Sequence, residues 1–379
     1  FGSRVQGAWI RPPGSLDRTF PPCVAMILRP AAEVGVVLLT ASLGVTKYST
    51  LAGVLCLIPT FVGNGIHSTC AKLAGPGTSA FAYVFYLACG VFLSCTIIVA
   101  AMGQRLEVSG PGLLGGLLLG VSCNLGINAI LFIGIVWSDM VVASVATLTA
   151  FLWGKLYFGE PSSNLGIALV GLVLLLLGIF GLSILLMLRL RSLGAEAESE
   201  SEGRGSSSLP GGRELTIGLV CAICCGAAGG TSFPINKLQP ADKQGASFVW
   251  AQSLGMVIAQ AVITMMALGW DSWVGAGESE KAQPLVRSRW EARRLLPLAL
   301  AQGAILAATN VTTTVAALSS LGVAVAQPVR EAGHSLSVLI GSFAFREYGE
   351  PDHRFMGSLL ACTAVEITGM ILLILYGGA

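Results

Sequence analysis

Charged side chains are scarce in this sequence. Asp, Glu, Lys and Arg make up 11% of the 379 residues, whereas a soluble domain carries about a quarter. Hydrophobic residues reach 54% and the mean hydropathy is +0.77, so polar groups are too few to cover a soluble globule. The composition excludes a water-soluble protein and predicts an integral, multi-pass membrane protein whose solvent is the lipid bilayer.

Other absences narrow the range of functions. The formal net charge is only +2, so we expect no nucleic acid partner. The chain has no phosphate-binding loop, which argues against ATP-driven transport. Cys221, Cys224 and Cys225 have no second Cys or His pair at zinc-finger spacing, and we interpret them as packing residues. We therefore expect no metal or cofactor.

A catalytic motif is also incomplete. The segment "GHSLS" (333–337) places Ser337 where a nucleophile elbow requires its final glycine, and no strand–turn–helix context surrounds it. We therefore do not expect an enzyme.

What the sequence does contain is a series of long apolar runs. Roughly ten of them have the ~20 residues that a helix needs to cross a bilayer core. They lie near 51–71, 80–102, 111–134, 139–158, 164–188, 215–235, 246–269, 295–317, 320–345 and 355–376. The fold class predicted is an all-α polytopic membrane protein. The apolar piece 34–46 is too short to cross, so an eleventh helix there is not favoured.

A polar tract, "LGAEAESESEGRGSSSLPGG", divides these runs five and five and is expected to be a solvated linker. The organisation predicted is an N-terminal extension or targeting segment, a first five-helix repeat, a polar linker and a second five-helix repeat, at residues 1–48, 49–190, 191–213 and 214–379. The loop arginines and lysines favour termini away from the cytosol, or a further crossing at 34–46, so orientation stays open.

The two halves resemble each other in sequence. "GNGIHSTCAKL" (63–73) aligns with "GGTSFPINKL" (229–238), and "LYFGEP" (156–161) recurs as "REYGEP" (346–351). Since each half has an odd number of spans, the second copy must insert upside down. Such inverted five-helix repeats place a substrate site near the midplane, where the halves meet and can rock past each other.

These motifs resemble the drug/metabolite transporter superfamily in its EamA-like part. The five-plus-five arrangement, a Lys-terminated first helix and Gly-Glu after helices four and nine carry the resemblance, which covers about 51–378. "GGTSFPINK" is similar to the first helix of bacterial glucose-uptake and rhamnose-transport proteins and of the transmembrane protein 144 family. The resemblance implies movement of small polar solutes, often sugars, by alternating access.

The ninth span is the most polar of the predicted helices. Wound at about 100° per residue, it gathers five polar residues on one side: Gln327, Arg330, Glu331, His334 and Ser337. Charge at membrane depth is costly, so this side must face protein or water. We expect Arg330 to pair with Glu366 of span ten beside a cavity, with a static strut as the alternative.

Glu331 and His334 are the candidates for proton handling, because a carboxyl group in a low-dielectric cavity can bind and release protons at physiological pH. The alternative is a passive hydrogen-bonded pair. Further candidates for the solute pathway are polar residues at matching places in the two halves. They are Asn124 with Asn128, Asn310 with Thr314, Asn64 with His67, and Ser232 with Asn236. Carboxamides and hydroxyls suit a sugar site, but they also join membrane helices to one another.

The function predicted from sequence is secondary transport of a small polar metabolite, most simply a sugar or sugar derivative, with proton coupling as an open option. Export of amphipathic or cationic compounds is the alternative within transport. A membrane-embedded enzyme or a non-transporting scaffold is the alternative from another class. The plasma membrane, an endomembrane and a plastid envelope all fit the sequence.

Overall fold

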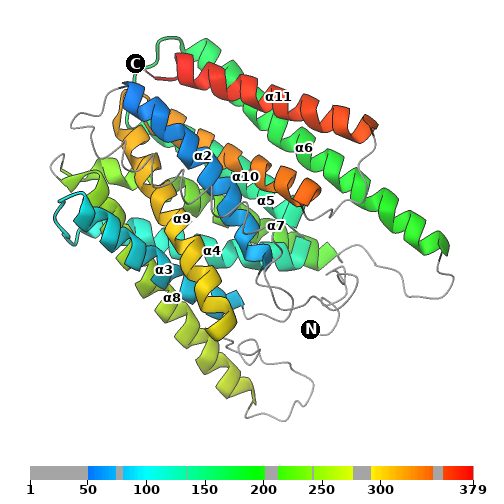
Figure 1. Cartoon of the computed structure of the whole chain (residues 1–379), viewed down its shortest axis with the longest axis horizontal. Coiled ribbons are helices and arrows are strands. Elements are labelled where there is room, and N and C mark those ends of the chain that lie inside the picture. The colour runs from blue at the N-terminus through cyan, green and yellow to red at the C-terminus, as the bar shows by residue number, and fades with distance from the viewer. Residues whose placement is uncertain are drawn as a thin grey trace.

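The protein is a bundle of long helices (Figure 1). The computed structural model describes residues 50–73, 80–133, 135–200, 212–240, 243–275, 292–344 and 353–378. Within these ranges every regular element is helical: α2 (Thr50–Leu73), α3 (Ala80–Ala101), α4 (Gly110–Ile133), α5 (Ile135–Leu152), η2 (Trp153–Tyr157), α6 (Leu165–Glu200), α7 (Gly212–Ser232), η3 (Pro234–Leu238), α8 (Ala246–Gly275), α9 (Ala292–Leu318), α10 (Val323–Ala344) and α11 (His353–Tyr376). The all-α class is confirmed.

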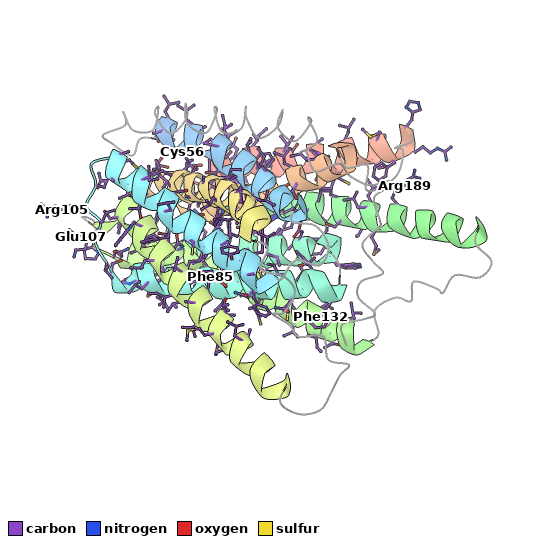
Figure 2. All side chains as sticks on the ribbon, turned by 60° about the horizontal axis from the view of Figure 1, so that its bottom comes forward. Cys56, Phe85, Arg105, Glu107, Phe132 and Arg189 are labelled. Carbon is purple, nitrogen blue, oxygen red and sulfur yellow. The ribbon has the colours of Figure 1, made fainter. Side chains whose placement is uncertain are left out.

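Among the described residues, nine helices are long and apolar enough to cross a membrane. The tenth, α10, is long enough but more polar, because it carries Gln327, Arg330, Glu331 and His334. Figure 2 shows Arg105 and Glu107 at one end of the bundle and Arg189 toward the other, so charged side chains flank the apolar spans. The chain is an integral, multi-pass membrane protein.

The element boundaries follow the predicted spans, and the largest difference is an extension of α6. Helix α6 continues to Glu200, into the segment expected to be linker, because its Leu, Ala and Glu residues are good helix formers and can extend a helix into water. The rest of the predicted linker up to 211, the extension 1–48 with its 34–46 segment, and the "REYGEP" motif lie outside the described residues.

The helices associate in a pattern that repeats between the halves. Helix α4 packs on α7 and α8, while α9 packs on α2 and α3; α5 packs on α7, while α10 packs on α2. Helices α6 and α11 pack on each other along the side of the bundle (Figure 1). Each helix of the first half thus has a counterpart five places later, from α2 with α7 to α6 with α11. Each of these contacts has a matching contact between the counterpart helices.

Glycines allow the closest of these contacts. At the α4–α8 crossing, a Cβ on Gly116 would lie 2.7 Å from the Cα of Gly255. At the matching α9–α3 crossing, a Cβ on Gly303 would lie 2.6 Å from the backbone of Gly90. Small residues of this kind let membrane helices approach backbone to backbone, where van der Waals contact rather than water exclusion holds them together.

Candidate functional site

Helix α10 lies inside the bundle. It packs against α2, α5 and α9, and Gln327, Arg330 and Glu331 are each no more than 6% exposed. At its crossing with α2, a Cβ on Gly65 would lie 2.7 Å from the carbonyl oxygen of Gly333, so the two backbones nearly touch. The polar side of α10 thus faces protein at membrane depth, as the cost of lipid-exposed charge requires.

One part of the cluster is a row along α10 itself. The Nε2 of Gln327 donates to Oε1 of Glu331 at 2.7 Å. The Nε2 of His334 lies 3.4 Å from the other carboxylate oxygen of Glu331. These spacings are one helical turn each, so the helix alone brings the three side chains together. Glu331 and His334, the candidates for proton handling, are therefore neighbours in this row.

Arg330 points to a different neighbour. Its guanidinium carbon lies 4.4 Å from the ring centre of Phe233, a cation–π distance. The backbone carbonyl of Arg330 accepts a hydrogen bond of 2.8 Å from Asn64 on α2. Its Nε is buried without a hydrogen-bond partner. Arg330 is therefore anchored by its backbone and by an aromatic face, and part of its donor capacity is unused.

The predicted Arg330–Glu366 ion pair is wrong. Among the described residues, no carboxylate lies within 4.0 Å of the Arg330 guanidinium. Oε1 of Glu366 instead accepts a 2.8 Å hydrogen bond from Ser335, and Oε2 has no partner. The reason is helix packing: α11 packs mainly on α6, whereas Arg330 is directed toward the residue that follows α7.

His67 completes the cluster from α2. It interacts electrostatically with Arg330 and His334, and both its ring nitrogens are buried without a hydrogen-bond partner. On α5, which packs against α10, Asp139 interacts electrostatically with His334. The cluster therefore draws on α2, α5 and α10, with the Phe233 ring after α7.

The break after α7 lies beside this cluster. Helix α7 ends at Ser232 and a 3₁₀ turn begins at Pro234, because proline cannot donate the next helical hydrogen bond. The Ser232 hydroxyl donates to the carbonyl of Gly229 at 2.7 Å, and Gln252 Nε2 donates to the Ser232 carbonyl at 3.3 Å. Asn236 is 3% exposed, with an unpartnered Oδ1.

Other predicted site residues take different positions. Asn124 donates to Gln260 Oε1 at 2.8 Å and to the Gly120 carbonyl at 3.0 Å, which ties α4 to α8. Asn128 donates to the carbonyl of Asn124 at 2.8 Å. The hydroxyl of Ser337 donates to the His334 carbonyl at 2.8 Å. These bonds hold Asn124 against α8, whereas Asn128 and Ser337 bond within their own helices.

Asn310 and Thr314 on α9 differ from Asn124 and Asn128 on α4. Each is 1% exposed, and the Oδ1 of Asn310 and the hydroxyl of Thr314 have no hydrogen-bond partner. Both therefore keep hydrogen-bonding capacity at membrane depth. As for metals, no group of three or more His, Cys, Asp or Glu side chains within the described ranges could hold an ion.

Two residues of the cluster were not expected from the sequence. Phe233 has no sequence signal, because a phenylalanine in an apolar run is ordinary. Asp139 falls at the predicted start of span four and so resembles a boundary charge, but α5 begins at Ile135 and carries it inside the helix. A charge one turn into an apolar run was the signal that could have identified it.

Comparison with known proteins is informative for the fold alone. No family model matches this chain, and no curated protein matches it. A solved crystal structure described as "Crystal structure of protein" superposes with a TM-score of 0.56 at 14% sequence identity, covering 86% of this chain and 96% of that chain. The bundle therefore has a counterpart among solved structures over most of its length.

Proposed function

We propose that the protein is a secondary transporter that moves a small polar metabolite, most simply a sugar or sugar derivative, by alternating access. The observation that carries the proposal is the buried cluster around Arg330, Glu331 and His334 at membrane depth. Ionisable groups in such places mark solute or ion pathways more often than structural supports. The resemblance to the drug/metabolite transporter superfamily in the motif sequences agrees with this role.

Two inverted five-helix repeats form part of the proposal. Thr50 at the start of α2 bonds to Ser320 in the turn before α10, at 2.6 Å. Lys237, after the end of α7, reaches Glu160 beside the same start of α10. Helix α2 thus begins where its counterpart α7 ends, as an inversion requires.

The alignment of the halves points the same way. It pairs Gly65 with Gly230. When the two "GEP" motifs are aligned and the register is continued back along the chain, Ala146 pairs with Leu336. A Cβ on Gly65 would lie 2.8 Å from Leu336, and one on Gly230 would lie 2.6 Å from the carbonyl of Ala146. Matching residues therefore make matching contacts in the two halves.

A polyhydroxylated solute suits the unused hydrogen-bonding groups. The side-chain oxygens of Asn236, Asn310 and Gln327 are buried without a donor. An unsatisfied buried acceptor costs about 1–3 kcal/mol, so hydroxyl donors from a solute would stabilise them. Sugar hydroxyls both donate and accept, which also matches Arg330 and Thr314.

The test is uptake into proteoliposomes that contain the purified protein, with a panel of radiolabelled sugars and sugar derivatives and with organic cations as a second group. A transporter accumulates or equilibrates its solute above the level of protein-free vesicles. Retention of cations alone would support the exporter alternative, for which the carboxylates of Asp139, Glu331 and Glu366 provide the chemistry. Chemical conversion without retention would identify an enzyme and overturn the proposal.

Proton coupling through Glu331 gives a separate prediction. Replacing Glu331 by Gln keeps a partner for Gln327 but removes the carboxyl group. We expect uptake driven by an imposed pH gradient to fall to the rate without a gradient, while exchange of labelled for unlabelled solute continues. If Glu331→Gln responds to the gradient as the parent does, Glu331 is not the coupling residue.

A further inference from the structure

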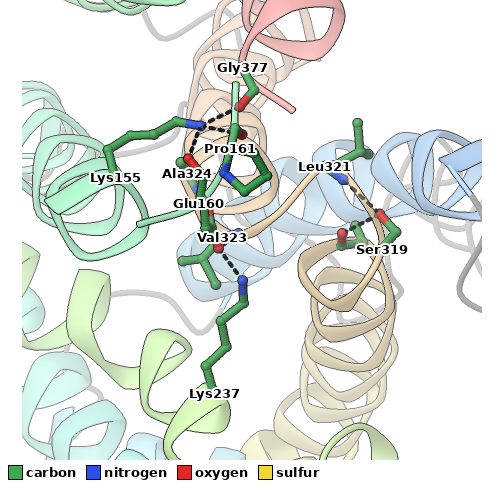
Figure 3. A network of polar contacts seen from close by, with 10 residues as sticks. Lys155, Glu160, Pro161, Lys237, Ser319, Leu321, Val323, Ala324 and Gly377 are labelled. Carbon is green, nitrogen blue, oxygen red and sulfur yellow. Dashed lines mark hydrogen bonds and ion pairs between the residues drawn. The ribbon is translucent and has the colours of Figure 1, made fainter. Parts of the chain in front are cut away.

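The end of the bundle where α10 begins holds a second polar network, separate from the buried cluster (Figure 3). Its centre is Glu160, in the loop that joins η2 to α6. The contacts of its carboxylate come from the other half of the chain: Lys237 after α7, and Val323 and Ala324 in the first turn of α10. Glu160 therefore joins the two halves at this end.

The Glu160 carboxylate makes three contacts at once. Oε1 accepts from the backbone N–H of Val323 at 2.8 Å, and Oε2 accepts from that of Ala324 at 2.9 Å. Lys237 pairs with Oε1. A carboxylate at the N-terminus of a helix is stabilised by the helix dipole as well as by these free N–H groups. Its side chain is only 7% exposed, so water screens these interactions weakly.

A lysine on the other side holds the same loop in place. The ammonium of Lys155 donates to the carbonyl oxygens of Glu160 at 3.2 Å, Pro161 at 3.0 Å and Gly377 at 2.5 Å. Gly377 follows α11, so this contact also joins the first half to the second. The two lysines approach the loop from opposite sides in Figure 3.

The backbone on both sides leaves room for the carboxylate. Gly322 has φ +75°, and a Cβ there would lie 2.6 Å from the carboxyl carbon of Glu160. Gly154 is equally confined, since its Cβ would lie 2.6 Å from Oε2. Gly159 has φ +59°, a conformation that glycine adopts without strain. The loop geometry thus fits an acidic side chain in this position.

We propose that Glu160, Lys237 and the first turn of α10, here called the end latch, hold this end of the transporter closed and must separate for the solute to pass there. The proposal rests on the alternating-access function proposed above. It follows from the helix contacts: Glu160 and Lys237 follow α5 and α7, which pack in one group with α4 and α8, whereas α10 packs in a second group with α2, α3 and α9. The two groups meet at the α3–α8 and α5–α10 contacts, so their separation at this end has to break the bonds from Glu160 to Val323 and Ala324.

A second ion pair at this end serves as a matched control. Lys243 lies 3.4 Å from Glu107 and also joins the two halves, but these side chains are 44% and 39% exposed. Exposed ion pairs contribute little, whereas a buried carboxylate that loses its cation is strongly destabilised. Removing Lys237 should therefore open this end, and removing Lys243 should leave it closed.

The experiment is hydrogen–deuterium exchange by mass spectrometry on the full chain in lipid nanodiscs, without solute, for Lys237→Met and Lys243→Met. The readout is a peptide that contains Val323 and Ala324, whose N–H groups Glu160 protects. In Lys237→Met we expect exchange at this peptide to rise about tenfold or more, with the parent rate in Lys243→Met. Lys237→Gln is the second neutral variant if the methionine variant does not fold.

The Lys237 variant distinguishes a latch from a simple helix cap. If Glu160 only caps α10, Lys237→Met leaves the cap bound and exchange matches the parent, which overturns the proposal. Because the measurement needs no solute, its result is independent of the uptake panel. Faster exchange with no transported solute supports a conformational latch but refutes transport; parent-like exchange in a protein that transports refutes the latch alone.

Discussion

Replacing Arg330 by Met is expected to reduce solute uptake about 10- to 100-fold while the protein stays folded. The guanidinium has no carboxylate within 4.0 Å among the described residues, and its Nε has no acceptor. A solute oxygen is the partner that this geometry leaves open. Hydrogen bonds to charged groups contribute about 1.5–3 kcal/mol each, which sets the size of the effect.

The folded state should tolerate this change. Methionine can occupy much of the arginine stem's space and can pack on the ring of Phe233, and the bond from Asn64 goes to the Arg330 backbone, which the substitution keeps. Arg330→Lys retains the charge but loses the planar stacking, so we expect an intermediate uptake rate. Initial rates in proteoliposomes and melting temperatures in detergent measure both effects. Normal uptake by Arg330→Met would show that Arg330 is a structural strut.

Replacing Gly116 by Val is expected to have the largest effect on stability, about 3 kcal/mol or more. A Cβ on Gly116 would meet the carbonyl oxygen of Gln252 and lie 2.7 Å from both the Cα of Gly255 and the N of Met256. These are backbone atoms of α8, which cannot rotate away. The α4 and α8 helices would have to separate and lose their contact along the crossing.

The measurement is the fraction of protein that is monodisperse after solubilisation, together with its thermal melting. Gly357→Val is the matched control, because Gly357 also lies in a helix, α11, and a Cβ there meets nothing within 4 Å. The control accounts for the weaker helix propensity of valine. A Gly116→Val protein that melts within a few degrees of Gly357→Val would contradict the close crossing.

The membrane class, the approximate spans and the polar side of α10 were predictable from the sequence. Each depends on residues close together along the chain: a bilayer core of fixed thickness selects runs of about 20 apolar residues, and one helix turn brings Glu331 to Gln327 and His334. Local geometry was enough to place these groups.

The partner of each side chain was decided only by the tertiary structure. Spacing made Glu366 a reasonable partner for Arg330, and Asn124 a reasonable pathway residue. In the structure Arg330 stacks on Phe233, Glu366 bonds to Ser335, and Asn124 joins α4 to α8. These outcomes depend on how each helix is rotated and which helix it crosses. That rotation is fixed by backbone contacts at glycines far apart in the chain, which no pattern within a single span encodes.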